Sequence, residues 1–271
     1  MKAVSARFTH PSLDGIHLHT LTWGSSAKPA LVLLHGGGAN VSWWTHLAPA
    51  LAERFHVTAL DFRGHGDSDY PEEVEKGGFD VDLRALLDHL AKPDAVLVGH
   101  SMGAHVALRH AAASSATRAI VLLEISRGAG AQLRRGARLA LALRRSYPSA
   151  QEAISRFRFL PSADHADPAL REHIARRSVG ALPDGRFSYK FDPRWFGLPS
   201  RAPANAGDVG CPTLILRGAE SRLLTPEGAQ QLANEIPGAE WREIEGAGHN
   251  LHLDRPESVL EALEHFLARH P

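Results

Sequence analysis

The sequence Gly99-His100-Ser101-Met102-Gly103, a serine between two glycines, constrains the fold more than any other stretch of the chain. It follows the short apolar run 95–98 and precedes a stretch of small residues with helical character at 104–113. A strand, a serine and a helix in this order predict a sharp turn in which the serine adopts strained backbone angles. Glycines on both sides avoid the clash that side chains would create there. We therefore expect the serine hydroxyl to stand exposed above a sheet, with a helix N-terminus behind it.

Short apolar runs alternate with helical stretches along most of the chain. Such runs are typical of strands buried on both faces of a parallel sheet, and their alternation with helices predicts a doubly wound, mostly parallel α/β sheet. The length of 271 residues suits one large domain or one domain with an insertion. The expected strands are 17–24 (antiparallel), 30–34, 57–60, 95–98, 119–123, 213–216 and 241–244, and the expected helices are 43–53, 81–90, 104–113, 226–235 and 256–268.

Residues 126–208 interrupt this alternation, because they contain no convincing buried strand. We expect helical pieces at 150–159 and 168–179 and a helical cap, or lid, over 126–208, inserted into a core formed by 1–125 and 209–271. A basic amphipathic helix on a membrane is the alternative for the arginine-rich part, but balanced charge and an Ala/Leu apolar side favour the solvated face of a cap helix. The arginines at helical spacing in this part are Arg134, Arg135, Arg138, Arg144 and Arg145.

The charge balance and the cysteine content narrow the classes of partner. Thirty Lys and Arg residues balance thirty Asp and Glu residues, which gives no electrostatic reason to expect nucleic acid or an acidic membrane. The single cysteine, Cys211, excludes an intramolecular disulfide and is interpreted as a small core residue. Without a Cys/His zinc spacing or an N-terminal signal peptide, we expect no metal, no cofactor and a cytoplasmic location. A small-molecule substrate is the expected partner, and the oligomeric state, monomer or homodimer, is left open.

A candidate base for the serine lies late in the chain. A serine hydroxyl is a poor nucleophile without a base, which in folds of this kind follows the last strand. His249 ends the sequence Gly246-Ala247-Gly248-His249, directly after the expected strand 241–244. The small residues before it would let the imidazole approach Ser101 closely. His249 is therefore the predicted base.

Backbone N–H groups that would stabilise a developing oxyanion can also be assigned. One should come from the residue after the serine, Met102. The other should come from the glycine loop 35–38, which follows the expected strand 30–34. We assign the second donor to the N–H of Gly37, with its neighbour Gly38 as the alternative.

Together, the glycine loop 35–38, the turn-rich segment 61–68, the serine turn 99–103 and the segment 246–249 resemble the α/β-hydrolase superfamily. The resemblance covers the chain except the cap, and it includes Asp254-Arg255-Pro256-Glu257 at the entry to the last helix. As a set, these motifs are specific for the fold but not for a substrate, since the superfamily hosts many reactions. The resemblance implies that the segment 61–68 braces the site by hydrogen bonding.

The acid that would orient His249 departs from the family pattern. The family usually places an aspartate after the strand corresponding to 213–216, where this chain has Ser221. Glu220 is one residue early, whereas Glu124 ends the strand 119–123, as the acid does in some haloalkane dehalogenases and a fungal lactone hydrolase. A carboxylate after a buried strand needs a partner, which the histidine would supply. We therefore favour Glu124 as the acid, keep Glu220 as the alternative, and retain a triad without an acid as a third reading.

These residues predict a serine hydrolase that cleaves a carboxylic ester or lactone of a small molecule through an acyl-enzyme. Epoxide hydrolases and dehalogenases of this fold use an aspartate nucleophile, so Ser101 argues against those reactions. A carbon–carbon bond hydrolase, a thioesterase and a cofactor-free perhydrolase remain as alternatives. A receptor of the same fold that binds a ligand with little turnover is an alternative from another class.

Overall fold

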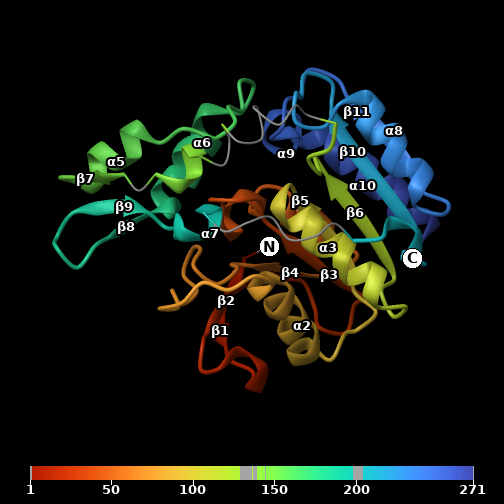
Figure 1. Cartoon of the computed structure of the whole chain (residues 1–271), viewed down its shortest axis with the longest axis horizontal. Coiled ribbons are helices and arrows are strands. Elements are labelled where there is room, and N and C mark those ends of the chain that lie inside the picture. The colour runs from red at the N-terminus through yellow and green to blue at the C-terminus, as the bar shows by residue number, and fades with distance from the viewer. Residues whose placement is uncertain (1, 129–135, 137–138, 144, 198–203, 271) are drawn as a thin grey trace.

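The computed structural model describes residues 2–128, 136, 139–143, 145–197 and 204–270 (Figure 1). Strands of the described chain build a central eight-stranded sheet, ordered β1-β2-β4-β3-β5-β6-β10-β11. Its first two pairs in this order, β1-β2 and β2-β4, are antiparallel, and the remaining pairs are parallel. This confirms the predicted doubly wound, mostly parallel α/β sheet. The strands are β1 (Val4–Phe8), β2 (Leu18–Trp23), β3 (Ala30–Leu34), β4 (His56–Leu60), β5 (Val96–His100), β6 (Ala119–Leu123), β10 (Thr213–Gly218) and β11 (Glu240–Ile244).

Continuous apolar sequence explains why the central strands were predictable. Every residue of β3, β5, β6 and β10 is buried, as expected of strands covered on both faces. Strand β1 was not expected, because four of its five residues are exposed and it lacks an apolar run. It pairs with β2 at the edge of the sheet, where only one side of a strand needs a partner.

Helices cover both faces of the sheet (Figure 1). On one face, α2, α3 and α8 pack against side chains such as Val32, Leu97 and Ile215. On the other face, α1, α9 and α10 pack against alternate residues of the same strands, such as Leu33, Val98 and Leu214. The period of two along a strand thus divides the core into two layers. These helices are α1 (Ala48–Leu51), α2 (Gly78–Leu90), α3 (Met102–Ala113), α8 (Pro226–Glu235), α9 (Leu251–Asp254) and α10 (Pro256–Arg269), with the 3-10 helices η1 (Pro11–Leu13), η2 (Val41–Trp44) and η3 (Ala206–Asp208).

The expected helix 43–53 is wrong as a continuous element. The structure has η2 up to Trp44 and a separate short α1 that begins at Ala48. Pro49 lies in the first turn of α1, the position where its missing N–H and fixed φ are tolerated. A continuous helix would place this proline in its interior, where the ring clashes with the preceding turn.

A helical insertion was expected, but the structure shows that the insertion is only partly helical. It contains a three-stranded sheet in the order β7-β9-β8 beside α5 and α6, which projects to one side of the central sheet (Figure 1). These strands are two or three residues long, too short to produce a readable apolar run. Of the predicted arginine-rich helix, Arg134, Arg135, Arg138 and Arg144 lie outside the described residues. The elements are β7 (Ser146–Tyr147), α5 (Ala150–Arg156), α6 (Pro168–Ser178), β8 (Val179–Ala181), β9 (Phe187–Tyr189) and α7 (Arg194–Gly197).

Both flanks of the insertion are attached to the core. Arg127 and Gly128 form β-bridges with Leu224, which follows β10. At the other flank, Ala206 belongs to the same hydrophobic cluster as α3 and α8. None of the helices that the structure describes is long and apolar enough to cross a membrane.

Candidate active site

Ser101 occupies the tight turn between β5 and α3. Its backbone angles, φ 50° and ψ −108°, lie outside the regions that most residues adopt. A Cβ on Gly99 would lie 2.4 Å from the carbonyl oxygen of Gly103, and a Cβ on Gly103 would lie 2.4 Å from that of Leu34. Both positions therefore require glycine, because the backbone passes too close to leave room for a side chain. The hydroxyl-bearing residue directly precedes the N-terminus of α3, where partial positive charge gathers.

Backbone strain singles out a second residue of the predicted site. Only four non-glycine residues of the described chain have positive φ: Asp14, Ala91, Ser101 and Glu124. Glu124, with φ 53°, directly follows β6, the strand that pairs with β5. Strained backbone persists where the surrounding contacts fix it, and it is common at functional sites. Two of the four residues are thus the candidate nucleophile and the favoured acid.

Glu124 is fully buried and meets the candidate base directly. Its Oε2 lies 3.0 Å from Nδ1 of His249. The same oxygen accepts a hydrogen bond from the Ser221 hydroxyl at 2.6 Å, and Oε1 accepts one from the backbone N–H of Gly218 at 2.8 Å. The side chain has no exposed surface. Three polar partners therefore compensate for burying this carboxyl group.

Glu220, the alternative acid, points elsewhere. Its side chain is 55% exposed, and its Oε2 lies 3.4 Å from Nε2 of His165 in the insertion. Ser221, at the position of the usual family acid, instead donates its hydroxyl proton to Glu124. From its position alone, Ser221 marks only the absence of the usual acid, and this hydrogen bond is a role that the sequence does not predict. The signal was present, because a hydroxyl at that place can reach a carboxylate at the end of the neighbouring strand.

Arg217 is a further residue that sequence reasoning missed. It is buried, its Nε donates to the carbonyl oxygen of Leu224 at 2.8 Å, and its Nη2 donates to the carbonyl oxygens of Ala219 and Ser221 at 3.2 Å each. An ion pair with Glu243 of β11 holds its Nη1. These contacts fix the loop after β10, and with it the hydroxyl that supports Glu124.

The loop that carries His249 lies against the serine turn. Nε2 of His100, the residue before Ser101, is 3.0 Å from the carbonyl oxygen of His249, and the two imidazole rings are 4.9 Å apart. The His249 side chain is 7% exposed. Gly246 adopts φ 64°, which lets the chain turn sharply after β11. The fold therefore places the segments 99–103 and 246–249, which carry the predicted nucleophile and base, against each other.

The glycine loop after β3 lies beside the same turn. A Cβ on Gly36 would lie 3.4 Å from Cβ of Ser101. The N–H of Gly38, the alternative oxyanion donor, instead points to Nε2 of His65 at 3.4 Å. Gly37 is half-buried, close to the ring of Phe196. Met102 is half-buried as the first residue of α3.

Burial shapes the proton affinities of the Glu124–His249 pair. Burial raises the pKa of Glu124 to about 8, against the opposing effects of the Ser221 and Gly218 hydrogen bonds and the Arg217 charge. Burial lowers the pKa of His249 to about 4. The imidazole is therefore held neutral around pH 7, the form in which it can accept a proton.

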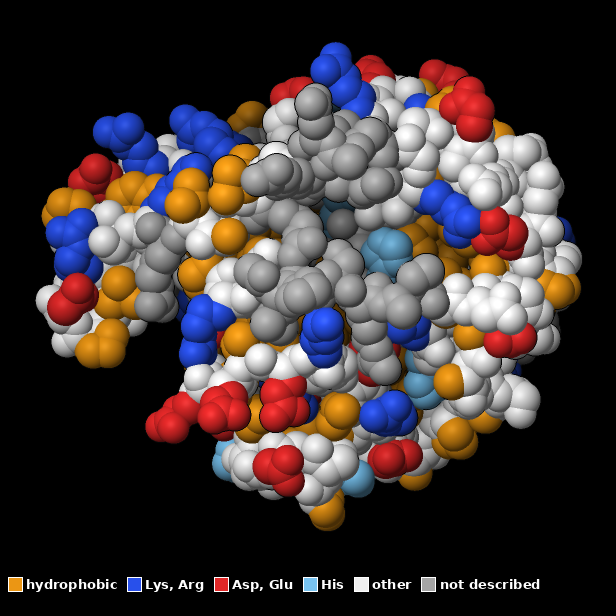
Figure 2. Space-filling model, in the orientation of Figure 1, with side chains coloured by type: hydrophobic (Ala, Val, Ile, Leu, Met, Phe, Trp, Pro, Cys, Tyr) orange, Lys and Arg blue, Asp and Glu red, His pale blue; other side chains and the backbone are white. Residues whose placement is uncertain are grey.

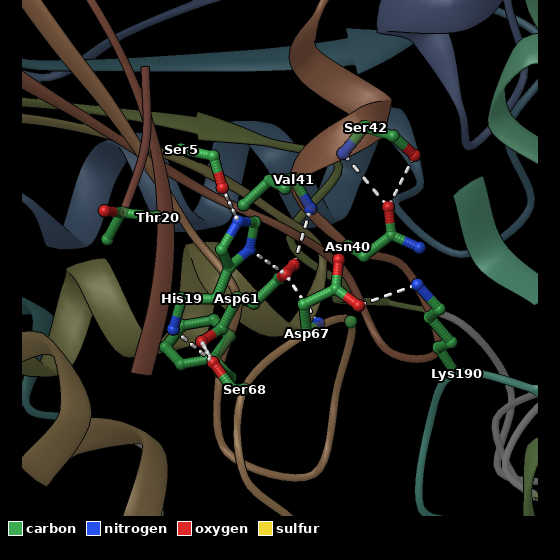
Figure 3. A network of polar contacts seen from close by, with 12 residues as sticks. Ser5, His19, Thr20, Asn40, Val41, Ser42, Asp61, Asp67, Ser68 and Lys190 are labelled. Carbon is green, nitrogen blue, oxygen red and sulfur yellow. Dashed lines mark hydrogen bonds and ion pairs between the residues drawn. The ribbon is translucent and has the colours of Figure 1, made fainter. Parts of the chain in front are cut away.

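A second polar network, around Asp61, connects β2, the start of η2 and the turn-rich segment 61–68 (Figure 3). Asp61 accepts hydrogen bonds from the N–H groups of Val41 and Asp67 at 2.7 and 3.0 Å and lies 2.7 Å from Nδ1 of His19. Lys190, in the insertion, contacts the Asp67 carboxylate at 2.7 Å. His19, Asp61 and Asp67 bring three potential metal-ligand atoms within 4.8 Å. Each of these side chains already has a partner within the protein: Asp61 binds His19 and backbone N–H groups, and the Asp67 carboxylate contacts Lys190.

Comparisons with known proteins identify the family of this chain. The model of the "Alpha/beta hydrolase family" matches residues 31–262. The chain is 27% identical over 266 residues to an sn-1-specific diacylglycerol lipase of Mus musculus, covering 92% of this chain and 84% of the relative. It is 28% identical over 256 residues to a 2-(acetamidomethylene)succinate hydrolase of Mesorhizobium japonicum, covering 88% of each.

Solved structures share the fold. The crystal structure of an E-2-(acetamidomethylene)succinate hydrolase superposes with a TM-score of 0.84 at 24% identity, covering 98% of this chain and all of that one. The structure of the Mycobacterium tuberculosis esterase Rv0045c gives a TM-score of 0.79 at 23% identity, covering 98% and 92%. With the family model matching most of its length, this chain belongs to the alpha/beta hydrolase family.

Proposed function

We propose that this α/β hydrolase is a serine esterase that cleaves a carboxylic ester or lactone of a small molecule. The observation that carries the proposal is the 3.0 Å contact between Nδ1 of His249 and Oε2 of Glu124, beside the strained turn of Ser101. A buried carboxyl group held against a histidine orients that histidine as a base for a serine. Relatives named as a diacylglycerol lipase and an esterase are consistent with ester substrates.

In the proposed mechanism, His249 takes the hydroxyl proton of Ser101 as the serine oxygen attacks the carbonyl carbon. The backbone N–H groups of Gly37 and Met102 stabilise the oxyanion of the tetrahedral intermediate. Ionised Glu124 holds the imidazole by its Nδ1–H and stabilises the imidazolium. His249 then protonates the leaving alcohol, and water repeats these steps on the acyl-enzyme to release the acid.

Gly37 is preferred over Gly38 as the donor for a reason that the sequence lacked. The N–H of Gly38 already faces the ring of His65. Gly37 also borders a groove between the core and the insertion, where a substrate has room. We propose accordingly that the insertion 126–208 acts as a cap over the site and selects the substrate.

Ser101→Ala tests the proposal. We expect the variant to keep the fold, measured by circular dichroism, and to lose turnover of p-nitrophenyl esters and lactones by about 10³-fold or more. A fluorophosphonate probe should label the wild-type protein and not the variant, since only an activated serine reacts quickly. Ser126→Ala is the matched control, because the Ser126 hydroxyl lies 3.3 Å from Nε2 of a half-buried histidine, His105. Labelling or turnover that survives Ser101→Ala, or that disappears with Ser126→Ala, contradicts the assignment.

A further inference from the structure

A groove lies between the glycine loop and the insertion. It is partly open to solvent. Gly37 and Gly38 form its wall on the core side. Most of its other described lining is apolar and aromatic, contributed by Trp43, Ala140, Leu141, Leu143, Phe157, Leu160, Tyr189 and Phe191. An apolar chain would be desolvated there, which is favourable by about 25 cal/mol for each Å² of apolar surface buried.

The aromatic lining is a packed surface. Phe157 stands edge-on to Tyr189, with ring centroids 5.5 Å apart, and Phe191 stands edge-on to Phe196 at 5.8 Å. Leu143 and Leu160 are 56% and 39% exposed, two of the five exposed large apolar side chains in the described chain. Such exposure at the mouth of a groove fits a binding surface for an apolar ligand.

Two cations lie in the same lining. Arg145 directly precedes β7, and Arg158 follows α5, so both belong to the side opposite the glycine loop. Nη1 of Arg158 is held by the carbonyl oxygens of Ser155 and Phe157, at 3.0 and 2.7 Å. Burial raises the pKa of the Tyr189 hydroxyl, and the charges of Arg145 and Arg158 both oppose this rise. The two guanidinium groups therefore both influence this hydroxyl.

No acidic residue balances these charges among the residues that are described as lining the groove. Neither arginine forms an ion pair with a carboxylate elsewhere in the described chain. On the face shown in Figure 2, Lys and Arg side chains lie among hydrophobic side chains over the part formed by α5, β7 and β9. An apolar lining with uncompensated positive charge is complementary to an amphiphilic anion.

We propose that the substrate is an ester with an apolar chain that ends in an anionic group, which Arg145 and Arg158 bind on the insertion side of the groove. This inference rests on the proposed esterase function, since it places the reacting carbonyl at Gly37 on the opposite wall. The guanidinium groups would recognise the charge, and the apolar residues between them and Gly37 would hold the chain. The anion is identified by its chemistry alone, a carboxylate or a phosphate monoester.

The decisive experiment measures binding rather than turnover. Dissociation constants of octanoate and octan-1-ol, an anion and a neutral ligand of equal chain length, are determined by NMR titration on Ser101→Ala. We expect octanoate to bind about fivefold more tightly, since exposed charge pairs contribute modestly. The double variant Arg145→Gln/Arg158→Gln should abolish this preference, and Arg145→Lys/Arg158→Lys should keep most of it. Octyl phosphate in a parallel titration distinguishes the phosphate source from the carboxylate source.

Arg171→Gln is the matched control. Arg171 is an exposed arginine of α6 in the same insertion, but it is not among the lining residues. It removes one positive charge from the insertion, where the double groove variant removes two, and should leave the preference intact. Equal affinities for octanoate and octan-1-ol, or an equal loss with Arg171→Gln, overturn the proposal.

Kinetics then separate this inference from the proposed function. The mono-4-nitrophenyl ester of adipic acid and 4-nitrophenyl hexanoate have chains of equal length, but only the first ends in a carboxylate. We expect kcat/KM to favour the anionic ester by about fivefold, and the preference to shrink at high salt. Turnover of both esters without preference, together with equal binding, refutes the anionic substrate and leaves the esterase intact. Anion-selective binding without turnover of either ester refutes the esterase and supports the ligand class.

Discussion

The loops that follow β6 and β10 each carry a glutamate, and the two glutamates have opposite environments. Glu124, after β6, has no exposed surface and meets His249, Ser221 and the backbone of Gly218. Glu220, after β10, is 55% exposed and has one long contact, to His165. The strands are neighbours in the sheet, so their ends lie side by side. Burial and hydrogen-bond partners therefore distinguish two candidate acids that the sequence alone leaves open.

In the proposed triad, the support for the histidine is shared between two loops. The loop after β10 retains the usual location but supplies a hydroxyl, from Ser221, in place of a carboxylate. The loop after β6 supplies the carboxylate. Arg217 keeps the first loop in place through the carbonyl oxygens of Ala219, Ser221 and Leu224. Each loop thus provides one half of the support for His249.

The largest expected difference between the two glutamates is in turnover. Glu124→Gln should lower kcat by about 10³-fold or more, because an amide can neither fix the required imidazole tautomer nor stabilise the imidazolium. Glu220→Gln, the matched control, should change kcat less than about twofold. Steady-state kinetics with a p-nitrophenyl ester measure both. A reversed order would move the acid to the loop after β10.

The second difference is in pH dependence. A buried carboxyl group with a raised pKa binds a proton in the folded state that the unfolded chain has released, so stability falls as pH rises up to the folded pKa of about 8. The pKa of His249 is lowered to about 4, so the contribution of His249 to the unfolding free energy changes with pH mainly below the ordinary value of 6.5. Between pH 6.5 and 8 the loss through Glu124 should therefore reach about 2 kcal/mol in unfolding free energy.

Activity should respond in the opposite direction. Ionised Glu124 with neutral His249 is the competent form, so kcat/KM should rise with pH up to about 8. Calorimetry and initial rates at pH 6.5 and 8 measure the two slopes. Glu124→Gln should flatten both, and Glu220→Gln should leave both unchanged. A wild-type stability that does not fall over this interval contradicts the raised pKa.

The smallest expected effect concerns the hydroxyl that joins the loops. Ser221→Ala removes one of the three partners of Glu124 and should lower the unfolding free energy by about 1 kcal/mol. Because this hydrogen bond lowers the pKa of Glu124, its loss should move the rise in activity to higher pH. Urea unfolding and the pH profile provide the measurements. A loss of kcat as large as that of Glu124→Gln would show that the hydroxyl itself is indispensable.

The sequence predicts those parts of the molecule that leave a local pattern. Buried runs give the strands β3 and β6 with their observed ends, and flanking glycines give the turn around Ser101. Strand β1 and the small sheet of the insertion escape, because exposed or very short strands have no apolar run. The Ser221–Glu124 bond and the Arg217 contacts join separate strands, so only the tertiary arrangement reveals them.

The attachment of the insertion has a practical consequence for chimaeric proteins. Glu124 lies just upstream of Arg127 and Gly128, and these two residues still pair with Leu224 in the core. Exchanging the insertion with that of a relative therefore requires a junction after Gly128 and before Ala204. A graft cut at those points would transfer the substrate selection proposed for the insertion, and it would leave the proposed acid, its hydroxyl partner and the bridge between their loops in one recipient scaffold.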